Sequence, residues 1–542
     1  MDKKAECLNR IQRGIKFGLF PAITLVFFGP LEIMIANRND FQFTFMDYWW
    51  INLLAAIGVV GVFTILTMVL PNRVGKILCL LSFAFTFCCY VQAMFMNQQL
   101  STLLGRKEIF DRQLEIVNAC IWLFIICLII IPYCVLKSKD KILNIYAYVG
   151  CFISAIQVVA LVVLLFTTPM IFDEKGSYVT AEGMFELAPT DNTIVFVLDS
   201  FDGGVLDDVL TIEPDILDEL DGFTCFDDCS SVYARTYPSI PYLLTGENCW
   251  YDEPFQDWVD KAYEKSAFIP TLIDNDINVG LYTYSNYIGN SIKNDLTNIH
   301  QGKLKTNKYQ LLKKSIKLLL YRDLPYICKN VFYYRSQDIN LDAVDSSEDR
   351  YRDFQDDWFM DMLKTSQIQN VVDAKGTFRF YHLGSFHIDF DINNAIKSLH
   401  IVDEYCKQLK DKGIYDNSTI IVTADHPVAH NGDYSILFLI KPQKAEGNMQ
   451  ISHAPVSQTE FIGTVLQSYN LSRSSDSVFD IPKNTERDRI KYETQLKNCS
   501  DIEGETELIE YILKGNSADS ENYEPTGKKW KILFSENHVA ID

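Results

Sequence analysis

Side chains of types that bind divalent cations follow two apolar runs after the first third of the chain. Asp199 ends the run that begins at Thr193, and Asp425 and His426 follow the run from Ser418. Carboxylate oxygens and imidazole nitrogens suit Mn²⁺, Mg²⁺ or Zn²⁺ rather than copper or iron–sulfur chemistry. A cation held there would activate a hydroxyl and neutralise charge on a phosphoryl group under attack. We therefore expect metal-dependent chemistry with a hydroxyl as the nucleophile.

The apolar runs themselves predict the scaffold of this site. Residues 193–199, 378–384 and 418–426 are rich in β-branched and apolar residues and stop at polar ones, which is typical of strands buried in a parallel sheet. Between the last two runs, residues 392–412 carry apolar side chains at helical spacing before Gly413, a suitable C-cap. Parallel α/β sheets bind ligands beyond the carboxyl ends of their strands, where we expect Asp199, His382, Asp425 and His426.

The segment Thr236-Tyr-Pro-Ser-Ile-Pro-Tyr-Leu-Leu-Thr-Gly246 resembles the sulfatase signature. In that signature a nucleophile is followed by x-Pro-Ser and, after a helical turn, by Leu-Leu-Thr-Gly. Sulfatases need Cys or Ser for conversion to formylglycine, which Thr236 cannot undergo, and Ile240 stands where an Arg is usual. Threonine is instead the pattern of phosphotransferases of the alkaline phosphatase and sulfatase superfamily, which include lipoteichoic acid synthases and lipid phosphoethanolamine transferases. The resemblance implies that Thr236 is the catalytic nucleophile.

The metal motifs of that superfamily have counterparts here. The segment around Asp199, Val-Leu-Asp-Ser, is similar to the one that carries the first metal ligand. Ala424-Asp-His426 is similar to the Ser-Asp-His-Gly motif, with Pro427 in place of the Gly. The resemblance implies one divalent cation, Mn²⁺ by preference with Mg²⁺ or Zn²⁺ as alternatives. Its implied ligands are Asp199, Thr236, Asp425 and His426.

A third group of matches concerns the substrate. His382-Leu-Gly-Ser-Phe-His387 resembles the segment that faces substrate in the superfamily, so His382 and His387 are expected to contact it. Residues 452–460 and 477–482 resemble later landmarks of the same group. Residues 273–298, where substrate residues would be expected, contain no recognisable motif. The sequence therefore leaves the substrate open.

Structural roles compete with some of these assignments. An Asp before a Ser at a strand end also caps turns and helices, so Asp199 alone is not specific. His453 fits a site role and a structural role equally well, whereas His400 and His430 fit solvated or packed positions better. Ser239 fits a helix cap better than a nucleophile. The prediction of a site depends on the order and spacing of the matches together.

Five apolar runs of about 20 residues precede this part of the chain, and each can cross ~30 Å of hydrocarbon as a helix. They are residues 17–36, 48–70, 77–96, 118–136 and 142–166. Lys and Arg are more frequent in the connections expected on the same side of the membrane as the N-terminus than in those on the opposite side, which contain Arg38, Arg106, Lys107 and Arg112. This asymmetry predicts a cytoplasmic N-terminus, and an odd number of crossings then puts the later residues outside. Apart from Glu32 the runs carry no charge, which favours anchoring over transport.

The expected fold is a five-helix transmembrane N-terminal region followed by an α/β, alkaline-phosphatase-like domain with a mostly parallel central sheet and a small C-terminal α+β subdomain. We expect the membrane region at residues 1–170, a juxtamembrane linker at 171–192, the catalytic domain at 193–470 and the C-terminal subdomain at 471–542. The protein is expected in the cell membrane as a multi-pass protein whose catalytic domain is extracytoplasmic.

The charge distribution bears on the partners. The formal net charge is −21, which argues against nucleic acid because phosphate binding needs clustered Lys and Arg. Residues 303–335 are an exception, since they are rich in Lys and aromatic side chains. That stretch fits either a solvated helix face or a basic surface against anionic lipid headgroups.

These features predict transfer of a phosphoglycerol-type or phosphoethanolamine-type group from a membrane phospholipid to a cell-surface glycan or glycolipid, through a covalent intermediate on threonine. One alternative is an extracytoplasmic phosphodiesterase or sulfatase-like hydrolase, which would use the same residues and give the group to water. Another is a non-catalytic membrane receptor on a degenerate enzyme fold, which the retained nucleophile and ligands disfavour. The bilayer and a lipid donor are the expected partners in the first case.

Overall fold

The computed structural model describes residues 3–37, 41, 43–97, 111–168, 177–302, 305–334, 339, 343, 350–483, 485–495 and 507–532. The chain divides into two compact units. The helical unit comprises Met1–Gly176 and Lys303–Glu348, and the α/β unit comprises Ser177–Gly302 and Asp349–Asp542. The chain therefore passes between the units three times. Residues 303–348, which the sequence boundaries assign to the catalytic domain, group with the helical unit, and residues 177–192, expected as a linker, group with the α/β unit.

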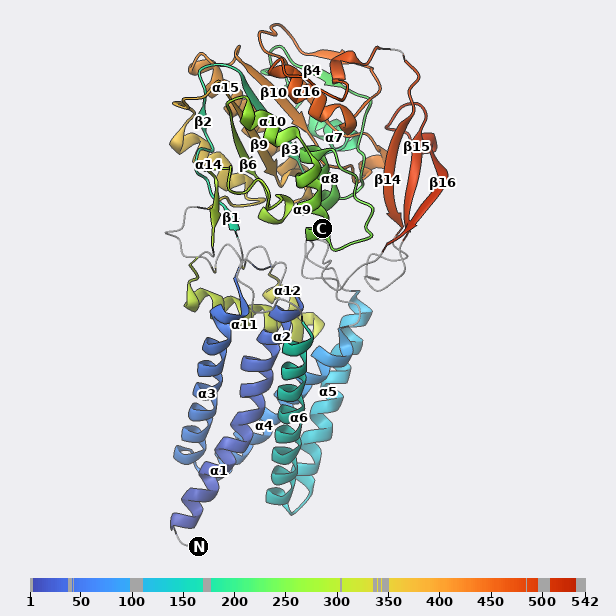
Figure 1. Ribbon diagram of the computed structural model, residues 1–542. Helices are drawn as coiled ribbons and strands as arrows, with labels where there is room; N and C mark the ends of the chain where they lie inside the picture. Colours follow the sequence, from blue (N-terminus) through green and yellow to red (C-terminus); the bar gives the residue numbers. More distant parts are fainter. Residues whose placement is uncertain are drawn as a thin grey trace. The chain divides into compact units, whose positions relative to one another are not determined.

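Five long helices make up most of the helical unit (Figure 1). The first runs without a break from Lys4 to Ala36 and consists of α1 (Lys3–Pro21), the π-helical segment η1 (Ala22–Phe28) and α2 (Gly29–Ala36). The others are α3 (Phe45–Val69), α4 (Asn72–Val91) continued by η2 (Gln92–Met96), α5 (Arg112–Val135) and α6 (Lys139–Thr167). All five are long and apolar enough to cross a membrane, as predicted. They extend beyond most of the apolar runs, because only the part within hydrocarbon must be apolar.

The surface of these helices is apolar. Large side chains such as Leu123, Phe124 and Phe152 are more than 60% exposed, at 62%, 62% and 67%. A helix can expose such side chains to acyl chains at no cost, because all of its backbone polar groups are satisfied internally. The helical unit is thus compatible with a multi-pass membrane protein. Arg38, Arg106 and Lys107, three of the four outer charges on which the predicted orientation depends, lie outside the described residues, and the orientation remains a prediction.

The part of the helical unit contributed by residues 303–348 is called the insert below. It contains α11 (Lys308–Asp323) and α12 (Tyr326–Phe332), which lie across one end of the five helices (Figure 1). Leu311, Leu318 and Leu319 of α11 share a buried apolar cluster with Phe28 and Leu31 of the first span. The basic stretch noted in the sequence falls on these helices, although its ends, Lys303 and Arg335, lie outside the described residues.

A seven-stranded sheet forms the centre of the α/β unit, in the order β12-β4-β11-β10-β3-β9-β6. Strands β10, β3, β9 and β6 run parallel, as do β12 and β4, whereas β11 is antiparallel to both of its neighbours. The mostly parallel sheet predicted from the apolar runs is therefore present. Its strands, in sheet order, are β12 (Gln450–Ser452), β4 (Thr224–Phe226), β11 (Phe438–Lys441), β10 (Ser418–Thr423), β3 (Asn192–Leu198), β9 (Gly376–Leu383) and β6 (Ile277–Tyr282).

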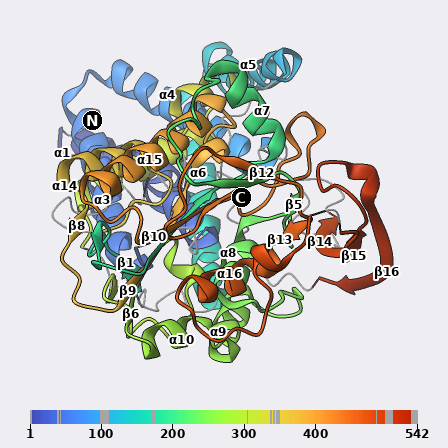
Figure 2. The same ribbon diagram turned by 90° about the horizontal axis from the view of Figure 1, so that it is seen from above.

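Helices cover both faces of this sheet (Figure 2). One face carries α7 (Gly203–Ile212), α14 (Asp356–Ser366) and α15 (Ile392–Asp411), and the other carries α8 (Thr236–Thr245), α9 (Phe255–Lys265), α10 (Phe268–Asp274) and α16 (Phe461–Ser468). Every residue of β3, β9 and β10 is buried, which explains why β3 and β10 are largely apolar without alternation. Three short two-stranded pairs are separate from the main sheet. They are β1 (Ser177–Val179) with β7 (Ile299–Gln301), β2 (Glu186–Leu187) with β8 (Gln369–Asn370), and β5 (Cys229–Ser230) with β13 (Val456–Ser457).

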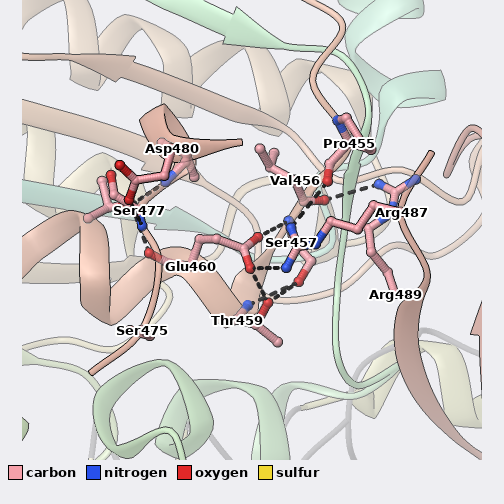
Figure 3. A network of polar contacts seen from close by, with 12 residues as sticks. Pro455, Val456, Ser457, Thr459, Glu460, Ser475, Ser477, Asp480, Arg487 and Arg489 are labelled. Atoms are coloured by element: carbon pink, nitrogen blue, oxygen red, sulfur yellow. Dashed lines mark hydrogen bonds and ion pairs between the residues drawn. The ribbon is translucent and has the colours of Figure 1, made fainter. Parts of the chain in front are cut away.

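The C-terminal part is an antiparallel sheet of β14 (Arg489–Gln495), β15 (Glu507–Leu513) and β16 (Tyr523–Lys531). Between residues 471 and 532 the described segments contain 3₁₀ turns but no α-helix, so the α+β character expected for this subdomain is not found in them. Two arginines at its start bind the main body. Arg489 pairs with Asp228 and donates to the Val456 carbonyl at 3.1 Å, and Arg487 pairs with Glu460 at 2.6 Å (Figure 3).

Candidate metal and nucleophile site

Three adjacent strands end at the candidate site. Asp199 follows β3, Asp425 and His426 follow β10, and His382 is the penultimate residue of β9. Because β10 pairs with β3 and β3 with β9 in parallel, their carboxyl ends meet at one edge of the sheet. The expected gathering of Asp199, His382, Asp425 and His426 at this edge is what the strand pairing produces.

Asp199, His382 and Asp425 could hold a metal ion together. One donor atom from each lies within 4.8 Å of the others, and all three side chains are at most 1% exposed. Nε2 of His382 and Oδ2 of Asp425 have no hydrogen-bond partner. Burying such groups unpaired is costly, and a divalent cation would remove that cost. The donor set therefore fits a metal ion, and it includes His382, which the sequence assigned to substrate contact.

The electrostatics of the two carboxylates support the same reading. Burial alone would raise the pKa of Asp199, but the nearby His387, His382 and His426 outweigh it and hold that pKa well below its usual range. Burial, and then the charge of Asp199, raise the pKa of Asp425 above its usual range. Two carboxylates this close do not both ionise readily unless positive charge is added between them. A divalent cation supplies that charge.

Thr236 lies beside these groups at the start of α8. It is 2% exposed, and its Oγ1 lies 3.3 Å from Oδ2 of Asp199 and 3.1 Å from Nε2 of His426. The hydroxyl can donate its proton to either atom. Its position in the first turn of a helix adds the positive end of the helix dipole, which favours a developing alkoxide or a phosphate. Gly246, with φ of 75°, ends α8 in the left-handed conformation, so the Thr-Gly that closes the motif is a C-cap.

His426 is oriented by the residue that departs from the superfamily pattern. Its Nδ1 lies 3.0 Å from the carbonyl oxygen of Pro427. A carbonyl can only accept, so Nδ1 carries a proton, and in the neutral ring Nε2 presents its lone pair toward Thr236. Pro427 is therefore compatible with the predicted role of His426 as a metal ligand or proton acceptor.

His387 stands at the open side of the group. Its Nδ1 lies 3.3 Å from Oδ1 of Asp199, and its side chain is 14% exposed, more than any other residue of the site. The rings of Phe354 and Phe390 flank it, with centroids 5.7 and 5.6 Å away. An imidazole N–H with this partial exposure can donate a hydrogen bond to an anionic group that enters from solvent. The substrate contact expected for His387 stays a prediction that this position supports.

Several residues that position the site have no local sequence signal. Ser200, at φ of 61°, donates its Oγ–H to Asp199 Oδ1 at 2.8 Å and its backbone N–H to Asp425 Oδ1 at 3.0 Å. A non-glycine residue in that conformation is uncommon and marks a constrained turn. Thr283 lies 3.1 Å from Nδ1 of His382, which leaves Nε2 of that ring free to face the carboxylates. Only Thr283 falls in the stretch where substrate residues were sought.

Gln458 connects the loop that carries Asp425 to the segment just before Thr236. Its Nε2 donates to the carbonyls of Ala424 and Asp425 at 3.1 and 2.6 Å, and its Oε1 accepts from the N–H of Val232 at 2.9 Å. It lies in the first position of a 3₁₀ turn whose capping box joins Ser457 and Glu460, and Glu460 is the partner of Arg487 (Figure 3). The residues 452–460 noted in the sequence are thus a support for the metal loop. Signals for this role were absent, because the partners are more than 30 residues away in the chain.

The remaining candidates lie elsewhere. His430, His400 and His453 lie within hydrogen-bond distance of carboxylates of Asp208, Glu213 and Asp227, at 2.8, 3.0 and 2.7 Å. His453 is the most exposed of the three, at 72% of its side chain, and does not contact the donor group. Ser239 is within α8 rather than at its cap, and its buried Oγ has no hydrogen-bond partner.

Solved structures that resemble this chain belong to the alkaline phosphatase and sulfatase superfamily. A superfamily protein from Vibrio parahaemolyticus has 12% sequence identity and a TM-score of 0.33, over 68% of this chain and 87% of that one. A phosphonate monoester hydrolase from Silicibacter pomeroyi has 11% identity and a TM-score of 0.37, over 62% and 88%. A lipoteichoic acid synthase from Listeria monocytogenes has 12% identity and a TM-score of 0.31, over 62% and 86%. No family model and no curated protein matches the sequence. At these identities the likeness concerns the fold alone.

Proposed function

We propose that this protein transfers a phosphoglycerol-type or phosphoethanolamine-type group from a membrane phospholipid to a hydroxyl of a cell-surface glycan or glycolipid. The observation that carries the proposal is the position of Thr236 Oγ1, 3.3 Å from Asp199 and 3.1 Å from the Nε2 lone pair of His426. A hydroxyl with two proton acceptors beside a buried Asp–His–Asp group is arranged as an activated nucleophile. The five apolar helices favour a substrate that resides in the bilayer.

A divalent cation bound by Asp199, Asp425 and His382 or His426 would neutralise charge on the phosphoryl oxygens and lower the energy of the Thr236 alkoxide. The side chains do the rest. Asp199 and His426 orient the Thr236 hydroxyl, and His426 is the base that takes its proton during attack if His382 instead of His426 binds the cation. His387, at the open side, binds a phosphoryl oxygen. The flanking phenylalanine rings limit the access of water.

In the first half of the reaction, Thr236 Oγ1 forms a bond to phosphorus as the bond from phosphorus to the lipid oxygen breaks. The diacylglycerol leaves as a neutral alcohol after taking up the proton that Thr236 gave up. In the second half, a hydroxyl oxygen of the acceptor attacks the phosphorus and the bond to Oγ1 breaks. The proton of the acceptor hydroxyl returns to Thr236, so no proton is gained or lost overall.

The alternatives differ from this proposal in what happens after the first step. A phosphodiesterase would use water as the second acceptor with the same residues. A sulfatase-like hydrolase of the usual kind is disfavoured, because threonine cannot form the formylglycine on which that chemistry depends. A non-catalytic receptor would need no buried nucleophile beside unpaired metal donors.

Mass spectrometry of the full-length protein in lipid vesicles tests the proposal. Vesicles containing phosphatidylglycerol or phosphatidylethanolamine are incubated with the protein and divalent metal, and the reaction is stopped with acid. We expect a phosphoglycerol or phosphoethanolamine adduct on the peptide that contains Thr236, removed when an acceptor glycolipid is added. Donor consumption by the protein with no adduct, and at the same rate in Thr236→Ala, would overturn the proposal. An adduct that water removes as fast as the acceptor does would favour the phosphodiesterase.

A further inference from the structure

The insert is held at one end of the helical bundle by ion pairs to two spans. Arg322, in the last turn of α11, pairs with Glu32 near the end of the first span. Lys308, at the start of α11, has its Nζ 3.2 Å from Oδ1 of Asp47 in the first turn of α3. The first span ends and α3 begins on the same side of the bundle, because they are consecutive. Glu32, the one charged residue of the apolar runs, therefore has a structural partner in the insert.

Hydrogen bonds from two further spans hold the end of α11 and the start of α12 at this same end of the helical bundle. The side chain of Asn97, just after η2, donates to the carbonyl of Arg322 at 2.9 Å. The N–H of Tyr326 donates to Oδ1 of Asn118, in the second turn of α5, at 3.1 Å, and the Tyr326 hydroxyl bonds to the Met96 carbonyl. The chain that leaves η2 re-enters the bundle in α5 on that side. If these helices cross a bilayer, the insert lies at one of its two interfaces.

The outer face of α11 has the chemistry of an interfacial helix. Tyr309, Lys313 and Lys317 follow at intervals of four residues, so they share one face. Tyr309 is 71% exposed, Lys313 is exposed and Lys317 is half-buried, whereas the leucines of the opposite face pack on the spans. The ammonium of Lys317 lies 4.5 Å from the ring centre of Tyr334. Tyrosine and lysine are favoured at headgroup level, because their apolar parts enter the interface while their polar ends stay hydrated.

The outer face of α12 is apolar. Ile327 and Val331, one helical turn apart, are 63% and 73% exposed. Helix α12 packs on α5, where Ile116 and Val117 are 57% and 55% exposed. The exposed apolar side chains of α12 thus adjoin those of a span that faces acyl chains. In water such a pair would be unfavourable, but at the edge of a hydrocarbon layer it is stabilising.

We propose that α11 and α12 form an interfacial lipid-binding element: Ile327 and Val331 enter the edge of the hydrocarbon layer, and Lys313 and Lys317 bind phosphates of anionic phospholipids. A bilayer is the occupant because this face sits at the level of the span ends and continues an apolar span surface. Two apolar side chains are also far too small a patch for a stable protein interface. The proposal requires that the helices span a membrane and does not depend on the reaction at Thr236.

Photo-crosslinking tests the depth of the element in full-length protein reconstituted in vesicles. A benzophenone amino acid is placed at Val331, or at Val371 of the α/β unit, which is the same residue type and 62% exposed. Leu123 on α5 serves as the position that must contact lipid if the spans cross the bilayer. We expect lipid adducts at Val331 and Leu123, and few or none at Val371. Adducts at Leu123 alone, a crosslink from Val331 to another protein instead of lipid, or equal lipid adducts at Val331 and Val371 would each overturn the proposal.

The charge requirement is tested in vesicles that contain equal amounts of phosphatidylglycerol and phosphatidylcholine. With the label at Val331, we compare Lys313→Glu/Lys317→Glu with a control of equal charge change, Lys407→Glu/Lys412→Glu, at an exposed position of α15 and at the exposed residue that follows this helix. Lysine near an anionic surface contributes about fivefold in binding per residue, so the insert variant should lower the anionic share of the adducts, expressed as the ratio of phosphatidylglycerol to phosphatidylcholine adducts, by about fivefold or more. The control should leave that share unchanged. An unchanged share in both variants would overturn the assignment of the lysines.

Discussion

Buried charge is held differently at two places in this protein, the insert of the helical unit and the candidate metal site of the α/β unit. In the helical unit, Arg322 pairs with Glu32 and Asp323, and Lys329, which is fully buried, donates to the carbonyls of Tyr321 and Arg322 at 2.7 and 2.6 Å. At the candidate site of the α/β unit, His382 and Asp425 are equally buried, yet Nε2 of His382 and Oδ2 of Asp425 have no hydrogen-bond partner.

The difference distinguishes buried charges that stabilise the fold by pairing with one another from buried charges that a bound ligand would complete. A buried ion pair fixes one arrangement, because removing either partner leaves a charge in a medium that solvates it badly. An unpaired buried group is tolerated where something absent from the chain completes it. The predictions below test whether the two sets of residues behave in these two ways.

The largest effect is expected at Thr236. Thr236→Ala removes the attacking oxygen and should lower turnover of a lipid donor by about a thousandfold or more, since the two-step path is lost. Thr236→Ser should keep part of the activity. Thr245→Ala is the matched control, because Thr245 is also buried in α8 but its hydroxyl bonds to the Pro241 carbonyl and the Glu247 N–H instead of the Asp–His group. Wild-type turnover by a folded Thr236→Ala protein would remove this residue from the mechanism.

The next effect concerns the metal. Asp425→Asn should lower activity about a hundredfold or more and abolish the rise in melting temperature that added Mn²⁺ gives the wild type. Without metal the variant should be at least as stable as the wild type, because a buried carboxylate whose Oδ2 has no hydrogen-bond partner has become neutral, while its Oδ1 can still accept the Ser200 N–H. Melting temperatures measured with a chelator and with added Mn²⁺ test both expectations, the unchanged or higher stability without metal and the lost stabilisation by metal. A variant less stable than the wild type in chelator would mean that Asp425 is paired within the protein after all.

The helical unit should respond in the contrary sense. Arg322→Ala leaves Glu32 and Asp323 without their cation and should destabilise the protein by about 3–5 kcal/mol. The triple variant Arg322→Met/Glu32→Gln/Asp323→Asn removes all three charges and should recover most of that loss. Thermal unfolding in detergent compares them. If the single and triple variants are equally unstable, the cluster does not act as a charge pair and the contrast between the units fails.

A smaller effect is expected from the support behind the site. Gln458→Leu removes two donated bonds to the metal loop and one accepted from Val232, and should lower kcat about tenfold with about 1–3 kcal/mol loss of stability. Gln408→Leu is a control of the same chemistry, since Gln408 is 7% exposed and bonds to the backbone of Ile368 and Leu363. The control should lose stability but not kcat. Equal loss of kcat in both would show only general destabilisation.

The smallest effect is a pH dependence at Asp356, which accepts the N–H groups of Gly384 and Ser385 at 2.9 Å each. Burial raises the pKa of Asp356 to about 6. Its contribution to stability is thus complete below the unfolded pKa of about 3.9 and is lost as the pH rises through about 6. Relative to Asp356→Asn, the wild type should lose about 1–3 kcal/mol between pH 4 and 7. Melting curves across that range measure it, and Asp357→Asn, at an exposed neighbour, should show no such trend.

The parts of the site that could be predicted are those with local signals. Asp199, Asp425 and His426 follow apolar runs, and Thr236 begins a motif, so strand order and a helix start were enough to bring them together. His382 was harder, because it lies within β9 and its approach to Asp199 depends on the pairing of β9 with β3. Gln458 and Ser200 act through hydrogen bonds to residues far away in the chain or through a strained φ, which no spacing reveals.

The fold shows the same division. The five spans follow from length and apolar composition, which are local properties. The grouping of residues 303–348 with the helices could not be predicted, because it depends on the pairing of Arg322 with Glu32, two residues 290 positions apart. The basic composition of that stretch fitted either a solvated helix face or a surface against lipid headgroups, and the boundaries expected from the sequence grouped it with the catalytic domain instead of the helices.

The three passages of the chain between the units have a consequence for proteolysis. Many anchored ectodomains are shed by one cut in the stalk that joins them to the membrane. Here a cut between Thr168 and Ser177 would leave the α/β unit attached through both ends of the insert, which is itself paired with the spans. Release would require cuts near Gly302 and Asp349 as well, and it would leave the α/β unit as two fragments held together without a covalent link, by pairings such as those of β3 and β6 with β9 and of β3 with β10.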